Sequence, residues 1–287
     1  MAIFINENTR VIVQGITGKQ GSFHTRQMIA YGTKIVAGVS PGKGGHQVEQ
    51  IPVYDSVFAA MKEHPADAGI LFVPAPFALE AAYEAIDAGL KLLVCITEHI
   101  PLHDAAKIMA FAQKRGTTVV GPNTFGIISS GKCKIGIMPN QFYVPGKVGV
   151  VSRSGTLSYE IVANLLNAGF GTSTVVGMGG DRIVGLDYIA VLKEFEKDPQ
   201  TEVIVMVGEI GGTSEEEAAD FIKDNISKPV VAYLAGKSAP PGKRMGHAGA
   251  IIERGRGTYA GKKEALERAG VQVADLPFQV PEIIKSY

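Results

Sequence analysis

The sequence is poor in cysteine and has no excess charge of either sign. Cys95 and Cys133 are its two cysteines among 287 residues, and neither belongs to a Cys-x-x-Cys motif. This argues against a disulfide framework or a structural metal and favours a reducing compartment. Lysine plus arginine and aspartate plus glutamate number 28 each, which removes the overall electrostatic argument for nucleic-acid binding.

Long hydrophobic runs are also missing. The N-terminus MAIFINENTR turns polar after its first five residues, unlike a secretory signal. No apolar stretch approaches the roughly 20 residues that cross a bilayer. We therefore expect a soluble, cytoplasmic protein that neither binds nucleic acid nor enters a membrane. At roughly 100–200 residues per domain the length predicts two domains.

Short β-branched runs alternate with helical patterns along the chain. Predicted strands of the first half span 10–14, 34–39, 69–73, 92–96 and 117–121, and predicted helices span 19–31, 55–63, 77–88 and 103–115. The second half predicts strands at 147–151, 173–177, 203–207, 229–234 and 271–274. Continuous apolar strands separated by helices predict parallel sheets covered on both faces.

The segment between the halves, 121–147, is rich in glycine and proline and has no helical period. We interpret it as the domain junction. The predicted fold class is therefore α/β, with a Rossmann-like domain over 1–125 followed by a flavodoxin-like, doubly wound domain over 126–287.

Glycine-rich loops follow the first two predicted strands. QGITGKQG (14–21) places three glycines between a strand and a helix, where bare backbone N–H groups favour phosphate. A close strand–helix crossing without a ligand is the alternative. VSPGKGG (39–45) places Lys43 where a dinucleotide-binding domain carries an acidic residue for the ribose. This predicts a ligand with several phosphates that is not a dinucleotide; a solvated lysine is the alternative.

Two further motifs lie in the second half. In VVSRSGTLSYE (150–160), Ser154, Gly155 and Thr156 stand where a helix begins and offer N–H groups and hydroxyls to an anion, or simply cap the helix. In GEIGGTSEEE (208–217), Glu209 directly follows an apolar strand, whereas the helix dipole explains the acidic run 215–217. Neither a Gly-x-Ser-x-Gly elbow nor a Walker A loop is present.

GKRMGHAGAII (242–252) carries a lone histidine, His247, between small residues. Imidazole is a good nucleophile at neutral pH, and flanking glycines leave room for a phosphoryl group. Glu209 could fix its tautomer. Metal binding is the rival, but the other histidines fall in the first half, so we expect no metal on this chain. A structural histidine is the third reading.

Together, GKRMGHAGAII, SRSGTLSYE, GEIGG, TGKQG and PGKGG resemble the α subunit of succinate–CoA ligase (succinyl-CoA synthetase), in the same order over essentially the whole chain. The resemblance implies that His247 is transiently phosphorylated, that Glu209 holds its ring, and that Ser154, Gly155 and Thr156 receive the phosphoryl group. It places the organic acid near Tyr159. It also assigns CoA binding in the first domain to Thr17, Gly18, Lys19, Gln20, Lys43, Ile96, Thr97 and Glu98.

The resemblance further implies an ATP-grasp β subunit that binds ATP or GTP with Mg²⁺, in an αβ or (αβ)₂ assembly serving the tricarboxylic acid cycle. Two positions depart from the family. Thr124-Phe125 replaces a common Cys-Pro, and Arg182 stands where succinate enzymes usually have proline. An arginine here resembles citrate–CoA ligases, in which it contacts a citrate carboxylate.

The expected reaction is acid + CoA + NTP ⇌ acyl-CoA + NDP + phosphate, with succinate as the acid and citrate as the alternative. Two other classes stay open at this point. The chain could be a non-catalytic CoA-binding regulatory protein, which the intact His247, Glu209 and Ser154 disfavour. It could also be an NAD-dependent dehydrogenase, which Lys43 disfavours.

Overall fold

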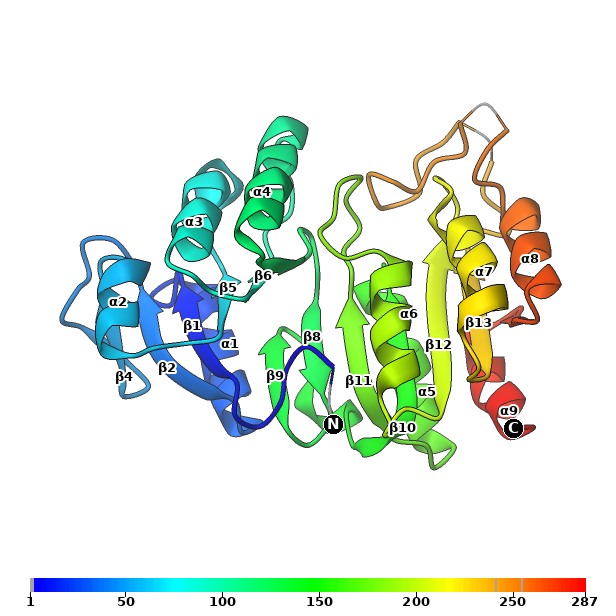
Figure 1. Cartoon of the computed structure of the whole chain (residues 1–287), viewed down its shortest axis with the longest axis horizontal. Coiled ribbons are helices and arrows are strands. Elements are labelled where there is room, and N and C mark those ends of the chain that lie inside the picture. The colour runs from blue at the N-terminus through cyan, green and yellow to red at the C-terminus, as the bar shows by residue number, and fades with distance from the viewer. Residues whose placement is uncertain (1–2, 241, 254) are drawn as a thin grey trace.

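The computed structural model describes residues 3–240, 242–253 and 255–287, which form two α/β units side by side (Figure 1). The first sheet has the strand order β3-β4-β2-β1-β5-β6-β7. Its strands are β1 (Arg10–Gln14), β2 (Lys34–Val39), β3 (Gln47–Val48), β4 (Ile51–Tyr54), β5 (Ala68–Leu71), β6 (Leu92–Cys95) and β7 (Thr118–Val120). They pair in parallel, except that β3 runs antiparallel to β4.

Helices cover both faces of this sheet, as continuous apolar strands require. They are α1 (Lys19–Ala30), α2 (Val57–Glu63), α3 (Ala75–Asp87) and α4 (Leu102–Arg115). Alternate residues of β1 enter opposite cores: Val11 and Val13 pack on the side of Met28 in α1, whereas Ile12 packs with α2, α3 and α4.

The second sheet has the order β14-β13-β12-β10-β11-β8-β9. Its strands are β8 (Gly126–Ser129), β9 (Cys133–Gly136), β10 (Pro145–Ser152), β11 (Thr172–Gly177), β12 (Val203–Glu209), β13 (Val230–Ala235) and β14 (Gln272–Ala274). Its helices are α5 (Gly155–Asn167), α6 (Tyr188–Lys197), α7 (Ser214–Asn225), α8 (Tyr259–Arg268) and α9 (Val280–Ile284), with 3₁₀ turns η1 (Asn140–Phe142) and η2 (Pro277–Gln279). The predicted α/β fold class is confirmed.

The segment 121–147 is more than a junction. It contains β8 and β9, an antiparallel pair whose first strand also pairs antiparallel with β11. A Cβ on Gly126 would overlap the carbonyl of Ile135, so glycine permits the close approach of these strands. The glycine content therefore marks tight strand pairing, which the sequence analysis did not predict; that the segment is the domain junction stays a prediction. The domain boundary at residue 125 stays a prediction; β7 ends at Val120 and β8 begins at Gly126.

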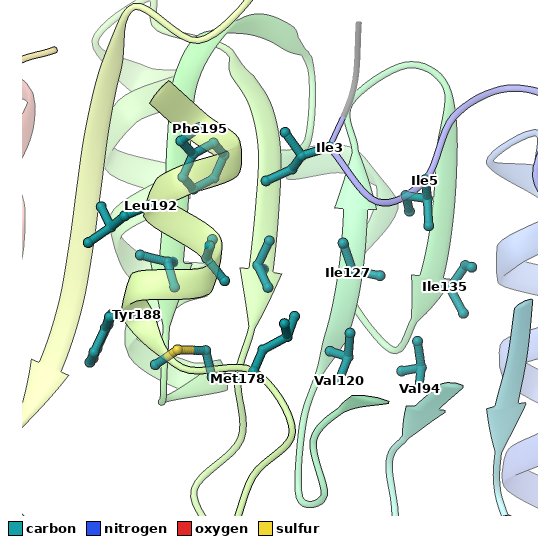
Figure 2. Packing of buried hydrophobic residues seen from close by; sticks show 14 of the residues in the cluster. Ile3, Ile5, Val94, Val120, Ile127, Ile135, Met178, Tyr188, Leu192 and Phe195 are labelled. Carbon is teal, nitrogen blue, oxygen red and sulfur yellow. The ribbon is translucent and has the colours of Figure 1, made fainter. Parts of the chain in front are cut away.

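One hydrophobic core is continuous between the two units. Figure 2 shows Val94 and Val120 of the first sheet beside Ile127 and Ile135 of the second, and the same cluster reaches Phe195 in α6. The carboxyl ends of the strands in each sheet therefore have a fixed relative position. Within the described ranges, no helix is long and apolar enough to cross a membrane.

Candidate active site

The first group of predicted residues surrounds the start of α1. Gly15 turns the chain there with a φ of +79°, and a Cβ on Gly21 would overlap the Gly15 carbonyl, so strand and helix cross at close range. The helix then begins at Lys19, and its N-cap Gly18 offers no capping side chain. Residues 17–20 therefore surround an open helix N-terminus, which favours an anion.

Lys43 lies in a loop that is tied to this helix start. Thr17 Oγ1 donates a hydrogen bond to Ser40 Oγ at 2.9 Å, and the Lys43 backbone N–H donates to the Ser40 carbonyl at 3.0 Å. The Lys43 side chain is exposed. The loops after β1 and β2 thus form one unit that can present a lysine and a helix N-terminus to the same ligand.

The predicted segment Ile96, Thr97 and Glu98 follows β6. Thr97 Oγ1 donates to the Val73 carbonyl at 2.6 Å, which fastens the segment to the loop after β5. In the sheet, β1 and β5 lie between β2 and β6. The structure therefore places this segment at the same edge as Lys43 but not beside it.

A cavity of about 530 Å³ opens between the loops after β1, β2 and β5 and helix α3, and residues 17–20, Lys43 and 96–98 are not among its lining residues. It lies where the strand order reverses between β1 and β5, the usual ligand position in open α/β sheets. Gln14, 3% exposed, lines it and donates through Nε2 to the Ala81 carbonyl at 3.0 Å. The Gln14 Oε1 atom finds no hydrogen-bond partner among the described residues. A buried acceptor of this kind is costly unless a ligand satisfies it.

His247 and Glu209 are in direct contact, although 38 residues separate them. His247 Nδ1 donates to Glu209 Oε2 at 2.7 Å, since a carboxylate can only accept. Their side chains are 27% and 9% exposed. The hydrogen bond to Glu209 raises the pKa of His247 above its ordinary value, whereas burial and the charge of Arg153 lower it. The contact leaves Nε2 as the ring nitrogen that is free to react.

Arg153 connects this pair to the loop after β11. Its Nε lies 3.5 Å from Glu209 Oε1, and its Nη2 donates to the Asp181 carbonyl at 2.7 Å. Gly180, the preceding residue, lies against the imidazole, because a Cβ there would come within 2.7 Å of the His247 ring. The Glu209 carboxylate therefore contacts both the His247 imidazole and the Arg153 guanidinium. Because residue 180 is a glycine, no side chain there collides with the His247 ring.

The loop that bears Asp181 is bonded in turn to the first unit. Asn123 Nδ2 donates to Asp181 Oδ1 at 3.0 Å, and Gly180 N–H donates to the Asn123 carbonyl at 3.1 Å. The Asn123 N–H donates to the Thr97 carbonyl at 3.0 Å. An unbroken path of polar contacts thus runs from the segment 96–98 to His247.

Ser154, Gly155 and Thr156 form the start of α5, as predicted. Ser154 Oγ accepts from the Leu157 N–H at 3.4 Å, and the Ser154 N–H donates to Ser152 Oγ at 3.1 Å. The capping alternative is therefore real for Ser154. It leaves the N–H groups of Gly155 and Thr156, which point along the helix toward its positive end, without an intrahelical acceptor.

Two further positions noted in the sequence, Tyr159 and Thr124, lie in α5 and beside it. Tyr159 is partly buried, its ring packs edge-on against Phe125 at a centroid distance of 5.7 Å, and burial raises its pKa to about 12. Thr124 donates through Oγ1 to the Gly177 carbonyl at 2.6 Å and accepts from the Gly126 N–H at 2.9 Å. Thr124-Phe125 thus fastens the start of β8 to β11. The role of Tyr159 in binding the acid stays a prediction.

Arg182 contacts two residues that follow His247 in the same loop. Its Nε donates to the Ala248 carbonyl at 3.3 Å, and its Nη2 pairs with Glu253 Oε1 at 3.1 Å. It lines a cavity of about 650 Å³ with Arg153. In Figure 1 the segment that holds His247 passes above the carboxyl end of β12.

Sequence reasoning missed three polar residues of this site: Gln14, Arg153 and Asp181. Each had a signal. Gln14 is a polar residue that ends an apolar strand, Arg153 immediately precedes the Ser-Gly-Thr motif, and Asp181 follows the paired glycines 179 and 180.

The fold and these contacts define a class of protein. The family described as CoA binding domain matches residues 6–99, and the family described as CoA-ligase matches residues 151–272. A CoA-binding unit followed by a histidine-bearing unit is thus the arrangement of a CoA ligase subunit.

The curated relatives narrow this class. A protein of Archaeoglobus fulgidus named succinate–CoA ligase (ADP-forming) subunit alpha 2 is 59% identical over 99% of both chains. The corresponding alpha subunit of Aquifex aeolicus is 54% identical over 99% of this chain and 94% of its own. The chain belongs to the family of succinate–CoA ligase α subunits, which excludes the dehydrogenase alternative.

A solved structure shares the whole fold. ATP citrate lyase from Methanothrix soehngenii, in complex with citrate and coenzyme A, matches 99% of this chain with a TM-score of 0.89 at 26% identity. The match covers 51% of that longer chain, so this protein spans about half its length.

Proposed function

We propose that this chain is the α subunit of a cytoplasmic acid–thiol ligase that converts succinate, CoA and a nucleoside triphosphate into succinyl-CoA, the diphosphate and phosphate. The observation that carries the proposal is the 2.7 Å contact between His247 and Glu209 in a loop bordered by glycines. It gives one imidazole a fixed tautomer and a free Nε2.

The chemistry follows from that tautomer. With its proton held on Nδ1 by Glu209, the ring presents a lone pair at Nε2, which attacks the terminal phosphorus while the nucleoside diphosphate leaves. Glu209 stabilises the positive charge that the phosphorylated ring acquires. A succinate carboxylate then takes the phosphoryl group from Nε2 and becomes an acyl phosphate. The CoA thiol, losing its proton, attacks the carbonyl carbon and displaces phosphate.

The α5 start and Arg153 serve the transfer by positioning charge, which is the main requirement of phosphoryl transfer. The N–H groups of Gly155 and Thr156 are oriented donors for phosphoryl oxygens. Arg153, already beside Glu209, supplies a guanidinium whose planar donors match an oxyanion.

The cavity at β1 and β5 supports CoA as the substrate of the first unit. The exocyclic amine of adenine is a donor that would satisfy the buried Gln14 Oε1, while the α1 start and Lys43 suit the phosphates. Gln14→Leu, which removes that acceptor, is expected to weaken CoA binding by about fivefold in a calorimetric titration. An unchanged affinity for CoA in the folded variant would show that the adenine of CoA does not contact Gln14.

The nucleotide and Mg²⁺ are assigned to a partner subunit of ATP-grasp type, in an αβ or (αβ)₂ assembly. In the described part of the chain, no group of three or more His, Cys, Asp or Glu residues could hold a metal ion. Cys95 and Cys133 are both free and buried, in keeping with a reducing compartment.

The decisive experiment is phosphorylation of the purified complex with γ-labelled nucleotide. Acid-labile, base-stable label is expected on wild type and on His103→Asn, an exposed histidine of α4, and should be absent from His247→Asn. Label that persists in His247→Asn would end the assignment. Absence of label from wild type, with CoA still bound, would favour the regulatory alternative.

Citrate remains the second candidate because of Arg182 and the likeness to ATP citrate lyase. In this chain the guanidinium of Arg182 already pairs with Glu253, and both curated relatives described above are named for succinate. We therefore expect succinate to be the faster substrate. A rate of acyl-CoA formation higher with citrate, and selectively lost in Arg182→Pro, would reverse this choice.

A further inference from the structure

Asn123 lies between β7 and β8 and contacts both halves of the site. Its backbone is left-handed, with a φ of +54°, a conformation that asparagine adopts more readily than most side chains. Its N–H donates to the Thr97 carbonyl at 3.0 Å, and its carbonyl accepts from the Gly180 N–H at 3.1 Å. Its side-chain Nδ2 donates to Asp181 Oδ1 at 3.0 Å. One residue thus joins the segment after β6 to the loop after β11.

The loop after β11 lies directly on the chain that precedes Asn123. The Gly185 N–H donates to the Gly121 carbonyl at 2.9 Å. A Cβ on Gly179 would come within 2.1 Å of the Pro122 carbonyl oxygen, so the two backbones are in close contact. Backbone contacts therefore hold both ends of this loop, and the Asn123 amide holds a side chain between them.

The position of this loop determines what Arg153 can bond. Arg153 Nη2 donates to the Asp181 carbonyl at 2.7 Å. Arg153 Nε and Glu209 Oε1 lie 3.5 Å apart, and both atoms are buried without a hydrogen-bond partner among the described residues. The orientation of the Arg153 guanidinium therefore depends on the carbonyl of Asp181, the residue whose carboxylate Asn123 holds.

The same loop also contacts the imidazole. A Cβ on Gly180 would come within 2.7 Å of the His247 ring, so the backbone beside Asp181 lies against that ring. A shift of the loop would alter both this support and the acceptor of Arg153. A misplacement of about 1 Å can slow a reaction that depends on positioning by about a hundredfold.

We propose that Asn123 is a positioning residue for phosphoryl transfer at His247, through the hydrogen bond from its amide to Asp181. The inference rests on the ligase function proposed above. It concerns the rate of transfer and not the affinity for CoA, because the contact with Thr97 is made by the backbone of Asn123. The alternative is that Asn123 serves only the left-handed turn.

Asn123→Gly separates these two roles. Glycine adopts the left-handed conformation readily and keeps both backbone hydrogen bonds, but it lacks the amide. The rate at which γ-labelled nucleotide phosphorylates the purified complex should fall about tenfold. The Kd for CoA, measured by calorimetry, should stay within about twofold of wild type. A wild-type rate of labelling would show a turn residue only, and an equal loss of CoA affinity would show a general structural defect; either result overturns the proposal.

An exchange of the two side chains tests the hydrogen bond itself. At pH 8 Asn123→Asp places two carboxylates face to face, so labelling should slow by about a hundredfold. Adding Asp181→Asn restores one donor and one acceptor with their roles exchanged, and the net charge is that of wild type. The double variant should label within about fivefold of the wild-type rate.

Asn225→Asp is the matched control, because it makes the same chemical change at an exposed residue of α7. It should label at the wild-type rate. The proposal is overturned if the double variant is no faster than Asn123→Asp, or if Asn225→Asp slows labelling as much as Asn123→Asp does. Absence of label from the wild-type complex would overturn the ligase function and this inference with it, whereas a wild-type rate in Asn123→Gly overturns this inference alone.

Discussion

The buried ion pair between Lys262 of α8 and Glu215 of α7 lies next to the backbone of Glu209, the residue that contacts His247. Lys262 is 0% exposed and Glu215 is 1% exposed. Glu215 Oε1 also accepts from the Glu209 backbone N–H at 3.1 Å and from the Tyr188 hydroxyl at 3.4 Å. The pair therefore fixes the backbone of the residue that holds His247.

Lys262→Met removes the ammonium and leaves the Glu215 carboxylate buried without its cation. Loss of one partner of a buried pair costs about 3–5 kcal/mol. Replacing Glu215 by glutamine as well keeps the acceptor for the Glu209 N–H and leaves an unpaired amide, which costs about 1–3 kcal/mol. The double variant should therefore recover roughly 2 kcal/mol relative to Lys262→Met.

The assay is urea unfolding at pH 8, followed by far-ultraviolet circular dichroism. Lys263→Met is the matched control, because Lys263 is a neighbouring lysine whose ion pairs lie at the surface. It should cost no more than about 1 kcal/mol. The reasoning is refuted if Lys262→Met lies within about 1 kcal/mol of wild type, or if the double variant is no more stable than Lys262→Met.

Three further outcomes are expected. Glu209→Gln removes the charge beside the imidazole, so the pKa of His247 should fall relative to wild type in an NMR titration of the ring; an unchanged pKa would contradict the contact. Burial lowers the pKa of His24 from 6.5 to about 4, so protonation favours the unfolded chain and stability is lost as the pH falls from 6.5 toward 4. His24→Phe, which keeps a ring against Phe72, should shrink the loss of urea midpoint between pH 7 and 5; an equal loss would rule out a neutral buried imidazole. Lys43→Met should weaken CoA binding by about 1–3 kcal/mol by calorimetry, and unchanged binding would remove Lys43 from the site.

Much of the fold was predictable because burial on both faces leaves a strong local signal. The run RVIVQ has three consecutive apolar residues, of which Val11 and Val13 enter one core and Ile12 enters the other. The exception, β8 with β9, shows where this signal fails. The β8–β9 hairpin needs glycines for the close approach of its strands, so its composition is that of a loop. It is also stabilised by the pairing of β8 with β11, almost 50 residues away in sequence, which local composition does not indicate.

The motifs in the sequence predicted several residues of the candidate site, but not the hydrogen bonds that join them. His247 and Glu209 each stood out by their neighbours, and the structure brings them into contact. The path through Asn123, Asp181 and Arg153 could not be predicted, because it depends on how the first unit meets the loop after β11.

The acidic run 215–217 shows the same limit more sharply. The helix dipole favours glutamates in the first turn of a helix. From the neighbouring residues alone, no other explanation of the three glutamates is needed. The dipole explanation treats the three as equivalent, whereas the structure turns Glu215 inward to Lys262, 47 residues away, and onto the backbone of Glu209. A buried charge must have such a partner, since it would otherwise destabilise the fold. The local rule therefore accounts for the presence of acids in the first turn. Only the long-range contacts show that Glu215 is the one of the three that also holds the backbone of Glu209.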